Sequence, residues 1–252
     1  MVIASHARRF SSSLLDFIYP LHCPGCEVWQ APGDRQALCG ACIRFLQATP
    51  GPLLAGCANC SHRPDGCLER VLADFSNVVE ATIHSLKFNG IKKIGPLLGR
   101  QIGASRELEL QLQLNTLDLL VPVPLHPARQ RERGFNQAQL IGMGLSVNLE
   151  IPVDSGCLHR HRSTVQQARL EAGDRLTNTQ GAFRAKRPPN RLAVSTEAGT
   201  IGLVDDVATT GATLAACSVA LKQQTDARIV GIAVASLFRS VVEGDATIGP
   251  VR

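Results

Sequence analysis

Aromatic residues are scarce in this sequence of 252 residues, where Phe, Trp and Tyr together make up 4%. Proteins that bind single-stranded nucleic acid without sequence preference stack its bases on aromatic side chains. The chain is therefore poorly supplied for an extended stacking surface. The aromatic residues that do gather lie near the N-terminus: Phe10, Phe17, Tyr19, Trp29 and Phe45.

Long hydrophobic runs are also missing. No segment approaches the ~18–20 apolar residues that span a bilayer. The apolar stretch after Arg8 and Arg9 is broken by residues 11–13 (SSS) and by Asp16, unlike a secretion signal. We therefore expect a cytoplasmic protein without a membrane span. Its net charge of +5 suits a phosphate-rich ligand and permits nucleic acid without requiring it.

Composition divides the chain into four stretches. Residues 1–20 form a lead-in. Residues 21–70 are rich in Cys, Gly and Pro but poor in periodic apolar pattern, which is typical of a small module held together by metal. Residues 71–240 alternate between helical and strand patterns, and we expect them to form the main domain. Residues 241–252 form a tail with no clear signal.

The main domain carries the pattern of an α/β fold. Apolar residues recur at helical spacing from residue 78 to about 89, and helical patterns also cover three further stretches. Short apolar runs predict buried strands between them. Strands that alternate with helices predict a mainly parallel sheet. The further helices are expected at 91–107, 137–149 and 212–224, and the strands at 117–123, 199–204 and 228–237.

The cysteines are unevenly distributed, since seven of the nine lie between Cys23 and Cys67. In a reducing compartment, such clustering favours metal over disulfides. Cys23 with Cys26 and Cys39 with Cys42 form two CxxC pairs, and two such pairs complete a tetrahedral Zn²⁺ site. The alternative is redox-active or free thiols. The two cysteines outside this region are expected to be small buried hydrophobic residues: Cys157 and Cys217.

Residues 202–214 (GLVDDVATTGATL) place two adjacent carboxylates between a buried strand and a helix. Ligands of open α/β sheets bind at that edge. Asp205 and Asp206 can accept hydrogen bonds from a vicinal diol such as that of ribose. The small, Thr-rich residues that follow let backbone amides and the next helix N-terminus approach an anion. One loop thus matches the layout of ribose 5-phosphate.

This loop predicts a binding site for phosphoribosyl pyrophosphate (PRPP). The alternative is a strand end with acidic residues followed by a Thr-rich helix cap. A P-loop is excluded because no Gly-Lys-Ser/Thr sequence follows the glycine. The residues expected to contact PRPP are Asp205, Asp206, Val207, Ala208, Thr209, Thr210, Gly211, Ala212 and Thr213.

Three other segments carry a resemblance to a known family. They are residues 121–138 (VPVPLHPARQRERGFNQA), residues 162–178 (RSTVQQARLEAGDRLTN) and the cysteine-rich region. With the loop at 202–214 and the tripeptide at 86–88 (LKF), they resemble the signature of the ComF family, whose main domain is of the type I phosphoribosyltransferase kind. The similarity extends over nearly the whole chain, from about residue 14 to 239.

The resemblance implies a type I phosphoribosyltransferase fold after a small double zinc ribbon. It implies that Leu125, His126 and Arg129 belong to a pyrophosphate-binding loop, and that Mg²⁺ accompanies PRPP. Segment 160–175 would be a loop that closes over the site. From the residues alone, these basic stretches also fit a solvated helix start and an ordinary surface loop. The candidate residues of the closing loop are Arg162, Thr164 and Gln167.

A double ribbon implies a second zinc site. Cys57, Cys60 and Cys67 would supply three ligands, but Arg70 stands where the family has a fourth cysteine. His62 is one candidate for the fourth ligand, although it lies only two residues after Cys60. A degenerate site held by core contacts is the other alternative.

Two functions remain open. By resemblance, the chain binds PRPP and takes part in DNA uptake during natural transformation or in DNA utilisation, with single-stranded DNA and uptake proteins as partners. Alternatively, it is an active phosphoribosyltransferase of nucleotide salvage or metabolism with an unidentified acceptor. No catalytic residue is evident, because such an enzyme acts mainly by positioning and charge neutralisation. Basic groups that could follow a phosphate backbone are Arg129, Arg131, Arg133, Arg160, Arg162, Arg184, Lys186, Arg187 and Arg191.

Overall fold

The computed structural model describes residues 22–30, 36–48, 54–55, 68–74, 76–105, 116–161, 181–189, 199–209 and 211–236. Its helices are α2 (Gly40–Ala48), α3 (Asn77–Phe88), α4 (Ile94–Ala104), α6 (Pro127–Arg133), α7 (Gln137–Leu149) and α9 (Ala212–Lys222). Its strands are β1 (Leu54–Ala55), β2 (Leu68–Asp74), β3 (Leu117–Pro122), β4 (Leu158–Arg160), β5 (Phe183–Ala185), β6 (Thr200–Ala208) and β7 (Arg228–Ser236).

A mainly parallel sheet forms the centre of the molecule. Its strand order is β1-β2-β7-β6-β3, in which β2, β7, β6 and β3 run parallel and only β1 is antiparallel. Strands β3, β6 and β7 are apolar and almost wholly buried, as expected for strands covered on both faces. The predicted α/β class with a parallel sheet is therefore confirmed. The sequence patterns predicted neither β1 nor β2.

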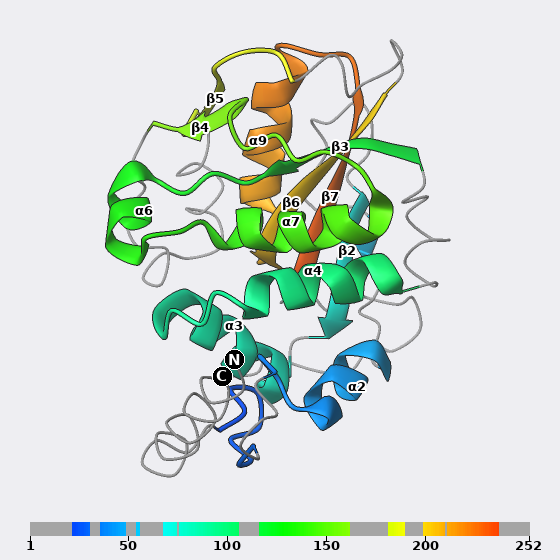
Figure 1. The fold of residues 1–252 in the computed structure, drawn as a ribbon. Helices are drawn as coiled ribbons and strands as arrows, with labels where there is room; N and C mark the ends of the chain where they lie inside the picture. The colour runs from blue at the N-terminus through cyan, green and yellow to red at the C-terminus, as the bar shows by residue number, and fades with distance from the viewer. Residues whose placement is uncertain are drawn as a thin grey trace, which may run out of the picture.

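Helices cover both faces of this sheet (Figure 1). Helices α4 and α7 pack on one face, where Ile141 and Leu145 join a core with Val204 and Ile232. Helix α9 and the β4–β5 hairpin cover the other face. A bulge in β3 places Leu117 and Leu120 in the first core and Leu119 and Val121 in the second.

Helices α4 and α7 approach each other unusually closely because glycines line their contact. A Cβ atom on Gly99 would overlap the carbonyl oxygen of Ile141, and one on Gly144 would overlap that of Pro96. The absence of side chains at these positions lets the two backbones touch. The two helices therefore pack as one layer on this face of the sheet.

Several element boundaries differ from those predicted. Strand β6 continues to Ala208, past the predicted end at residue 204, because it stays paired with β7 up to Ser236. Asp205 and Asp206 therefore belong to the strand itself. Helix α4 begins at Ile94 instead of residue 91, since residues 91–93 form a turn. Within the described ranges, no helix has the length and apolar composition that a bilayer crossing requires.

Candidate ligand pocket and metal site

A cavity of about 430 Å³ opens at the carboxyl ends of β3 and β6. Ligands of parallel sheets bind at this edge. The wall is built from α3, the β3–α6 turn, the starts of α7 and α9, and the end of β4. Its residues are Glu80, Ile83, His84, Lys87, Phe88, Val123, Pro124, Leu125, Arg129, Arg133, Asn136, Gln137, Ala138, Arg160, Asp205, Asp206, Val207, Thr209 and Thr213.

Two adjacent carboxylates stand at the end of β6. The backbone N–H of Asp206 donates a hydrogen bond to Oδ1 of Asp205 at 2.8 Å, and Oδ2 of Asp206 lies 2.9 Å from Nζ of Lys87. Burial and the neighbouring Asp206 charge raise the pKa of Asp205 to about 7, although Lys87 and Arg160 oppose this rise. The buried Asp205 carboxyl group therefore binds its proton more tightly than an ordinary aspartate does.

The loop after β6 leads directly into the start of α9. Gly211 adopts a left-handed conformation, with φ of 64°, immediately before the first residue of α9. Thr209 and Thr213 face the cavity, whereas Ala208 and Ala212 are buried and do not line it. Five of the residues predicted to contact PRPP therefore lie on the cavity wall: Asp205, Asp206, Val207, Thr209 and Thr213. Thr210 lies outside the described residues.

The turn after β3 brings two of its three predicted residues to the cavity. Leu125 and Arg129 line the wall. His126 does not: it begins α6, where its Nδ1 atom accepts a hydrogen bond from the backbone N–H of Ala128 at 3.3 Å. The structure thus gives His126 a helix-capping position. The residues predicted for the closing loop, Arg162, Thr164 and Gln167, lie outside the described residues.

The start of α7 is tied to the end of β3 by Asn136. Its Oδ1 atom accepts from the N–H of Ala138 at 3.0 Å, and its Nδ2 donates to the carbonyl oxygen of Val123 at 3.0 Å. The adjacent Gln137 is 1% exposed and lines the cavity. Its Nε2 atom has no hydrogen-bond partner among the described residues. Such a buried donor is costly unless a ligand or water accepts from it.

Helix α3 supplies wall residues that the sequence analysis did not assign to a site. Glu80, His84 and Lys87 follow one another at intervals of four and three residues, so they share one face of the helix. In the sequence, this polar stripe lies beside the apolar stripe of Val79 and Leu86, and that pattern is the feature from which a site on α3 could be predicted. The tripeptide at 86–88 had been noted only as part of the family resemblance.

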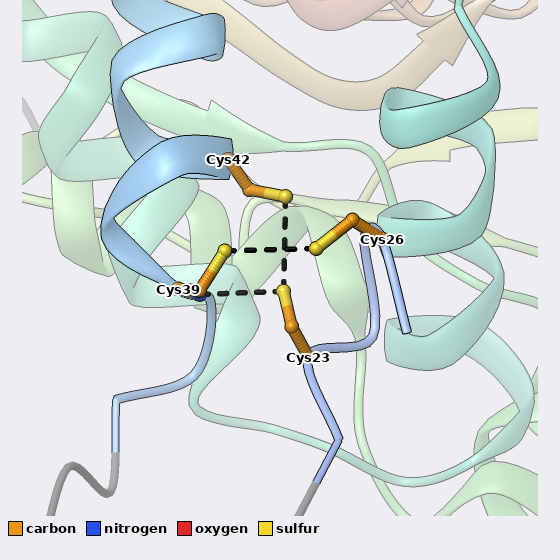
Figure 2. Close-up of side chains that lie close together, drawn as sticks. All are labelled: Cys23, Cys26, Cys39 and Cys42. Atoms are coloured by element: carbon orange, nitrogen blue, oxygen red, sulfur yellow. Dashed lines mark hydrogen bonds between the residues drawn. The ribbon is translucent and has the colours of Figure 1, made fainter. Parts of the chain in front are cut away.

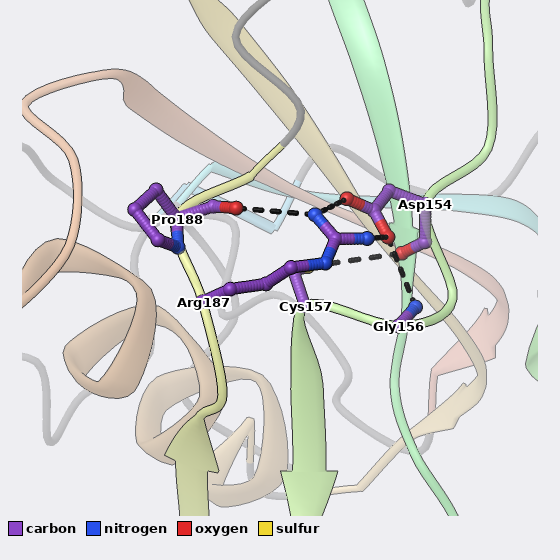
Figure 3. Close-up of polar contacts among 5 residues, drawn as sticks. All are labelled: Asp154, Gly156, Cys157, Arg187 and Pro188. Atoms are coloured by element: carbon purple, nitrogen blue, oxygen red, sulfur yellow. Dashed lines mark hydrogen bonds and ion pairs between the residues drawn. The ribbon is translucent and has the colours of Figure 1, made fainter.

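The β4–β5 hairpin brings Arg160 to the cavity, and an ion pair closes the base of the hairpin (Figure 3). Arg187 contacts both carboxylate oxygens of Asp154, at 2.7 and 2.9 Å, and the N–H of Gly156 also donates to Asp154. Asp154 is buried, so this bidentate pair compensates its charge. Arg187 is one of the basic residues that could follow a phosphate backbone, but its guanidinium is bound to Asp154, with half of the side chain still exposed.

Four cysteine sulfurs converge near the N-terminus (Figure 2). The sulfurs of Cys23 and Cys42 lie 3.7 Å apart, those of Cys26 and Cys39 lie 3.6 Å apart, and all four lie within 4.8 Å of one another. In a tetrahedral site with Zn–S bonds of about 2.3 Å, the sulfurs are separated by about 3.8 Å. The cluster therefore has the dimensions of a metal site.

The environment of these cysteines also fits metal binding. The backbone N–H of Cys39 donates to the sulfur of Cys23 at 3.3 Å, a contact that supports a metal-bound thiolate. Burial raises the pKa of the Cys42 thiol, so a cation is needed to make this sulfur a thiolate. Cys57, Cys60 and Cys67 lie outside the described residues. Cys157 and Cys217 are fully buried in the core, as predicted.

Comparison with known proteins finds several curated relatives. The chain is 34% identical over 195 residues to "DNA utilization protein YhgH" of Escherichia coli strain K12, covering 71% of this chain and 81% of the relative. It is 30% identical over 191 residues to "Competence protein F" of Haemophilus influenzae, covering 71% and 82%. The Salmonella typhimurium protein named YhgH is 33% identical over 192 residues, covering 74% and 78%. No family model matches the chain.

Proposed function

The chain belongs to the ComF family, and from that membership and its cavity we propose that it binds PRPP and acts in DNA uptake or utilisation. The main observation in favour of PRPP is that Asp205 and Asp206 line the same cavity as the Thr-rich start of α9. The carboxylates suit the ribose diol, and the helix start suits the 5′-phosphate.

The charges of the cavity wall support an anionic ligand. Four cationic side chains line it, namely Lys87, Arg129, Arg133 and Arg160, against the three carboxyl groups of Glu80, Asp205 and Asp206. Arginine side chains suit phosphate oxygens because of their fixed donor geometry. In this proposal, Mg²⁺ bound together with PRPP would supply positive charge to the pyrophosphate, and Asp205 and Asp206 would be the acidic residues able to hold it. The sheet with α7 and α9 then constitutes a type I phosphoribosyltransferase fold.

In the same proposal, Cys23, Cys26, Cys39 and Cys42 bind a structural Zn²⁺ ion. Gly25, between the first two ligands, packs against Val78 and Thr82 of α3. The metal site therefore supports the helix that carries Lys87 on another face. Its role is to hold the cavity wall in place, as closed four-cysteine sites do.

The assignment to DNA rests on the names of the relatives, one a DNA utilization protein and another a competence protein. Single-stranded DNA would meet the basic wall through its phosphates, so its affinity should fall as salt rises. A binding measurement with a single-stranded oligonucleotide at several salt concentrations tests this part. An affinity that does not depend on salt would argue against contacts to the DNA backbone.

PRPP binding is tested by calorimetry with and without Mg²⁺. The double variant Asp205→Asn with Asp206→Asn should lose about tenfold or more in affinity, because each hydrogen bond to a charged group contributes strongly. Asp226→Asn is the matched control, since Asp226 is exposed and lies in the turn before β7, at the opposite edge of the sheet. Equal affinities in the wild type and both variants would contradict the proposal.

The same titrations decide between binding and turnover. Release of pyrophosphate from PRPP on addition of a candidate nucleophile would identify an active transferase. Binding without release would leave PRPP as a ligand that the protein senses. Zinc content is measured in parallel, because loss of zinc in the double variant would show misfolding instead of a lost contact.

A further inference from the structure

The last turn of α3 presents two aromatic rings at the cavity. His84 and Phe88 are four residues apart, so they lie on one face of the helix. Their ring centroids are 4.8 Å apart and their planes are tilted by 43°. Both residues line the cavity wall. The rings therefore form a small aromatic surface in a chain that has few aromatic residues.

Phe88 is exposed over 66% of its surface, more than most of the large hydrophobic residues that the structure describes. A single exposed hydrophobic residue needs no functional explanation. Phe88 differs because Arg133 of α6 holds its guanidinium carbon 5.3 Å from the ring centroid. Arg133 therefore makes a cation–π contact with a ring that is largely exposed and that lines the cavity.

The cavity wall combines two kinds of chemistry. It includes the carboxylates of Asp205 and Asp206 and the threonines near α9, where the ribose phosphate is proposed. Phe88 lies on α3, directly after Lys87, whose Nζ reaches Asp206. One helical turn therefore supplies both a partner for the sugar end and a flat apolar surface beside it.

We propose that Phe88, with His84 and Arg133, is a stacking platform for a nucleobase that enters this cavity next to a phosphate. A nucleobase presents a π face to Phe88, and the adjoining phosphate meets Arg129 and Arg133. The Nε2 donor of Gln137 on the same wall, which has no partner in the part of the chain that the structure describes, fits the acceptor atoms that such a ligand carries. This inference rests on the proposed function, because it names a second group that the same cavity would bind.

The test compares variants of the ring with probes that contain or lack a base. Deoxyadenosine monophosphate and a short single-stranded oligonucleotide carry a base, whereas ribose 5-phosphate does not. Phe88→Leu removes the π face but keeps an apolar side chain, and Phe88→Trp keeps the π face. Phe45→Leu is the matched control, because Phe45 is an exposed phenylalanine on α2, away from the cavity.

Phe88→Leu should weaken binding of the base-containing probes by about 5- to 150-fold, the range of one base–aromatic stack. Ribose 5-phosphate should bind to Phe88→Leu with an affinity within about twofold of that for the wild type. Phe88→Trp should keep the wild-type affinity for the base-containing probes, and Phe45→Leu should leave that affinity unchanged. A loss with deoxyadenosine monophosphate supports a free nucleotide as the ligand. A loss with the oligonucleotide alone supports a base within a strand.

The platform is excluded if Phe88→Leu leaves both base-containing probes unchanged. It is also excluded if Phe88→Leu weakens the binding of ribose 5-phosphate to the same extent, since Phe88 would then only shape the cavity. These outcomes are separate from failure of the proposed function. If PRPP does not bind the wild type but the base-containing probes still depend on Phe88, the PRPP assignment falls and the platform stands.

Discussion

The Nζ atom of Lys87 lies 2.9 Å from Oδ2 of Asp206, which joins the end of α3 to the end of β6 across the cavity wall. Both side chains are partly buried, at 24% and 14% exposure, so water screens this pair less than a surface pair. The Lys87 charge also opposes the rise in the pKa of Asp205. One lysine therefore influences both carboxylates.

Replacing Lys87 should raise the pKa of Asp205 further above its value of about 7. In Lys87→Met the positive charge is lost while the stem is kept, so the charged form of Asp205 is less stabilised. An NMR titration of the aspartate carboxyl carbons measures the change. Lys93→Met is the control, because Lys93 is exposed at the start of α4. An unchanged pKa in Lys87→Met would contradict this electrostatic link.

Asp205 should make the protein less stable as the pH rises through 7. Its pKa is about 7 in the folded chain against a usual value of 3.8, so the folded state holds a proton that the unfolded state has lost. Stability from this group is full below the unfolded value and is lost as the pH passes the folded value. Between pH 6 and 8 the loss is about 1 kcal/mol.

Asp205→Asn should remove this dependence. The unfolding free energies of wild type and variant, measured by urea denaturation from pH 6 to 8, should converge at low pH and diverge at high pH in favour of Asn. Titrating groups that do not interact with Asp205 contribute equally to both proteins and cancel in the difference. Parallel pH profiles would show that Asp205 is ionised throughout the range.

The sequence predicted the parts of the fold that depend on local pattern. Strand β7 and helix α7 followed from continuous apolar runs and helical spacing, and the cysteine cluster followed from CxxC spacing. The acidic pair was located because two carboxylates after an apolar strand are a local signal. Such features need no knowledge of tertiary contacts.

The missed features depend on contacts between distant segments. Strand β2 pairs with β7 although more than 150 residues separate them, and its own pattern is too mixed to predict a strand. The cavity role of α3 was missed because its polar face matters only once the helix lies beside β6. Likewise, the pairing of Arg187 with Asp154 cannot be read from a run of basic residues.

Gln137 should show opposite effects on stability and on binding. Its buried Nε2 has no partner among the described residues, so Gln137→Met removes an unsatisfied donor at similar volume. The free energy of unfolding should rise by about 1 kcal/mol without ligand. Affinity for PRPP or a nucleotide should fall. If denaturation shows a clear loss of stability, Gln137 is part of the structural core instead of the ligand site.

The cysteine cluster should bind one zinc ion and stabilise α3. Cys39→Ser should lower the zinc content by one equivalent relative to wild type, as measured by plasma mass spectrometry, because a closed site needs all four thiolates. The amides of α3 should then exchange hydrogen faster, since Gly25 of the cluster packs on Val78 and Thr82. The control variant Cys217→Ala should retain the zinc content of the wild type, because Cys217 lies in the core and not in the cluster. Full zinc in Cys39→Ser would exclude this site.

Helix α7 should tolerate a methyl group at Gly142, which faces β3 and β6, but not at Gly144, which faces α4. In Gly144→Ala the new Cβ would overlap the carbonyl oxygen of Pro96, and a backbone atom cannot turn aside, so the helices must separate. A loss of about 1–3 kcal/mol is expected. In Gly142→Ala the nearest atom is 3.7 Å away, at ordinary contact distance, and the better helix former should add up to about 1 kcal/mol to the free energy of unfolding.

Chemical denaturation of both variants measures the difference, and equal stabilities would mean that α4 and α7 are packed less tightly than described. Because α7 begins at the cavity, Gly144→Ala should also weaken ligand binding, whereas Gly142→Ala should not.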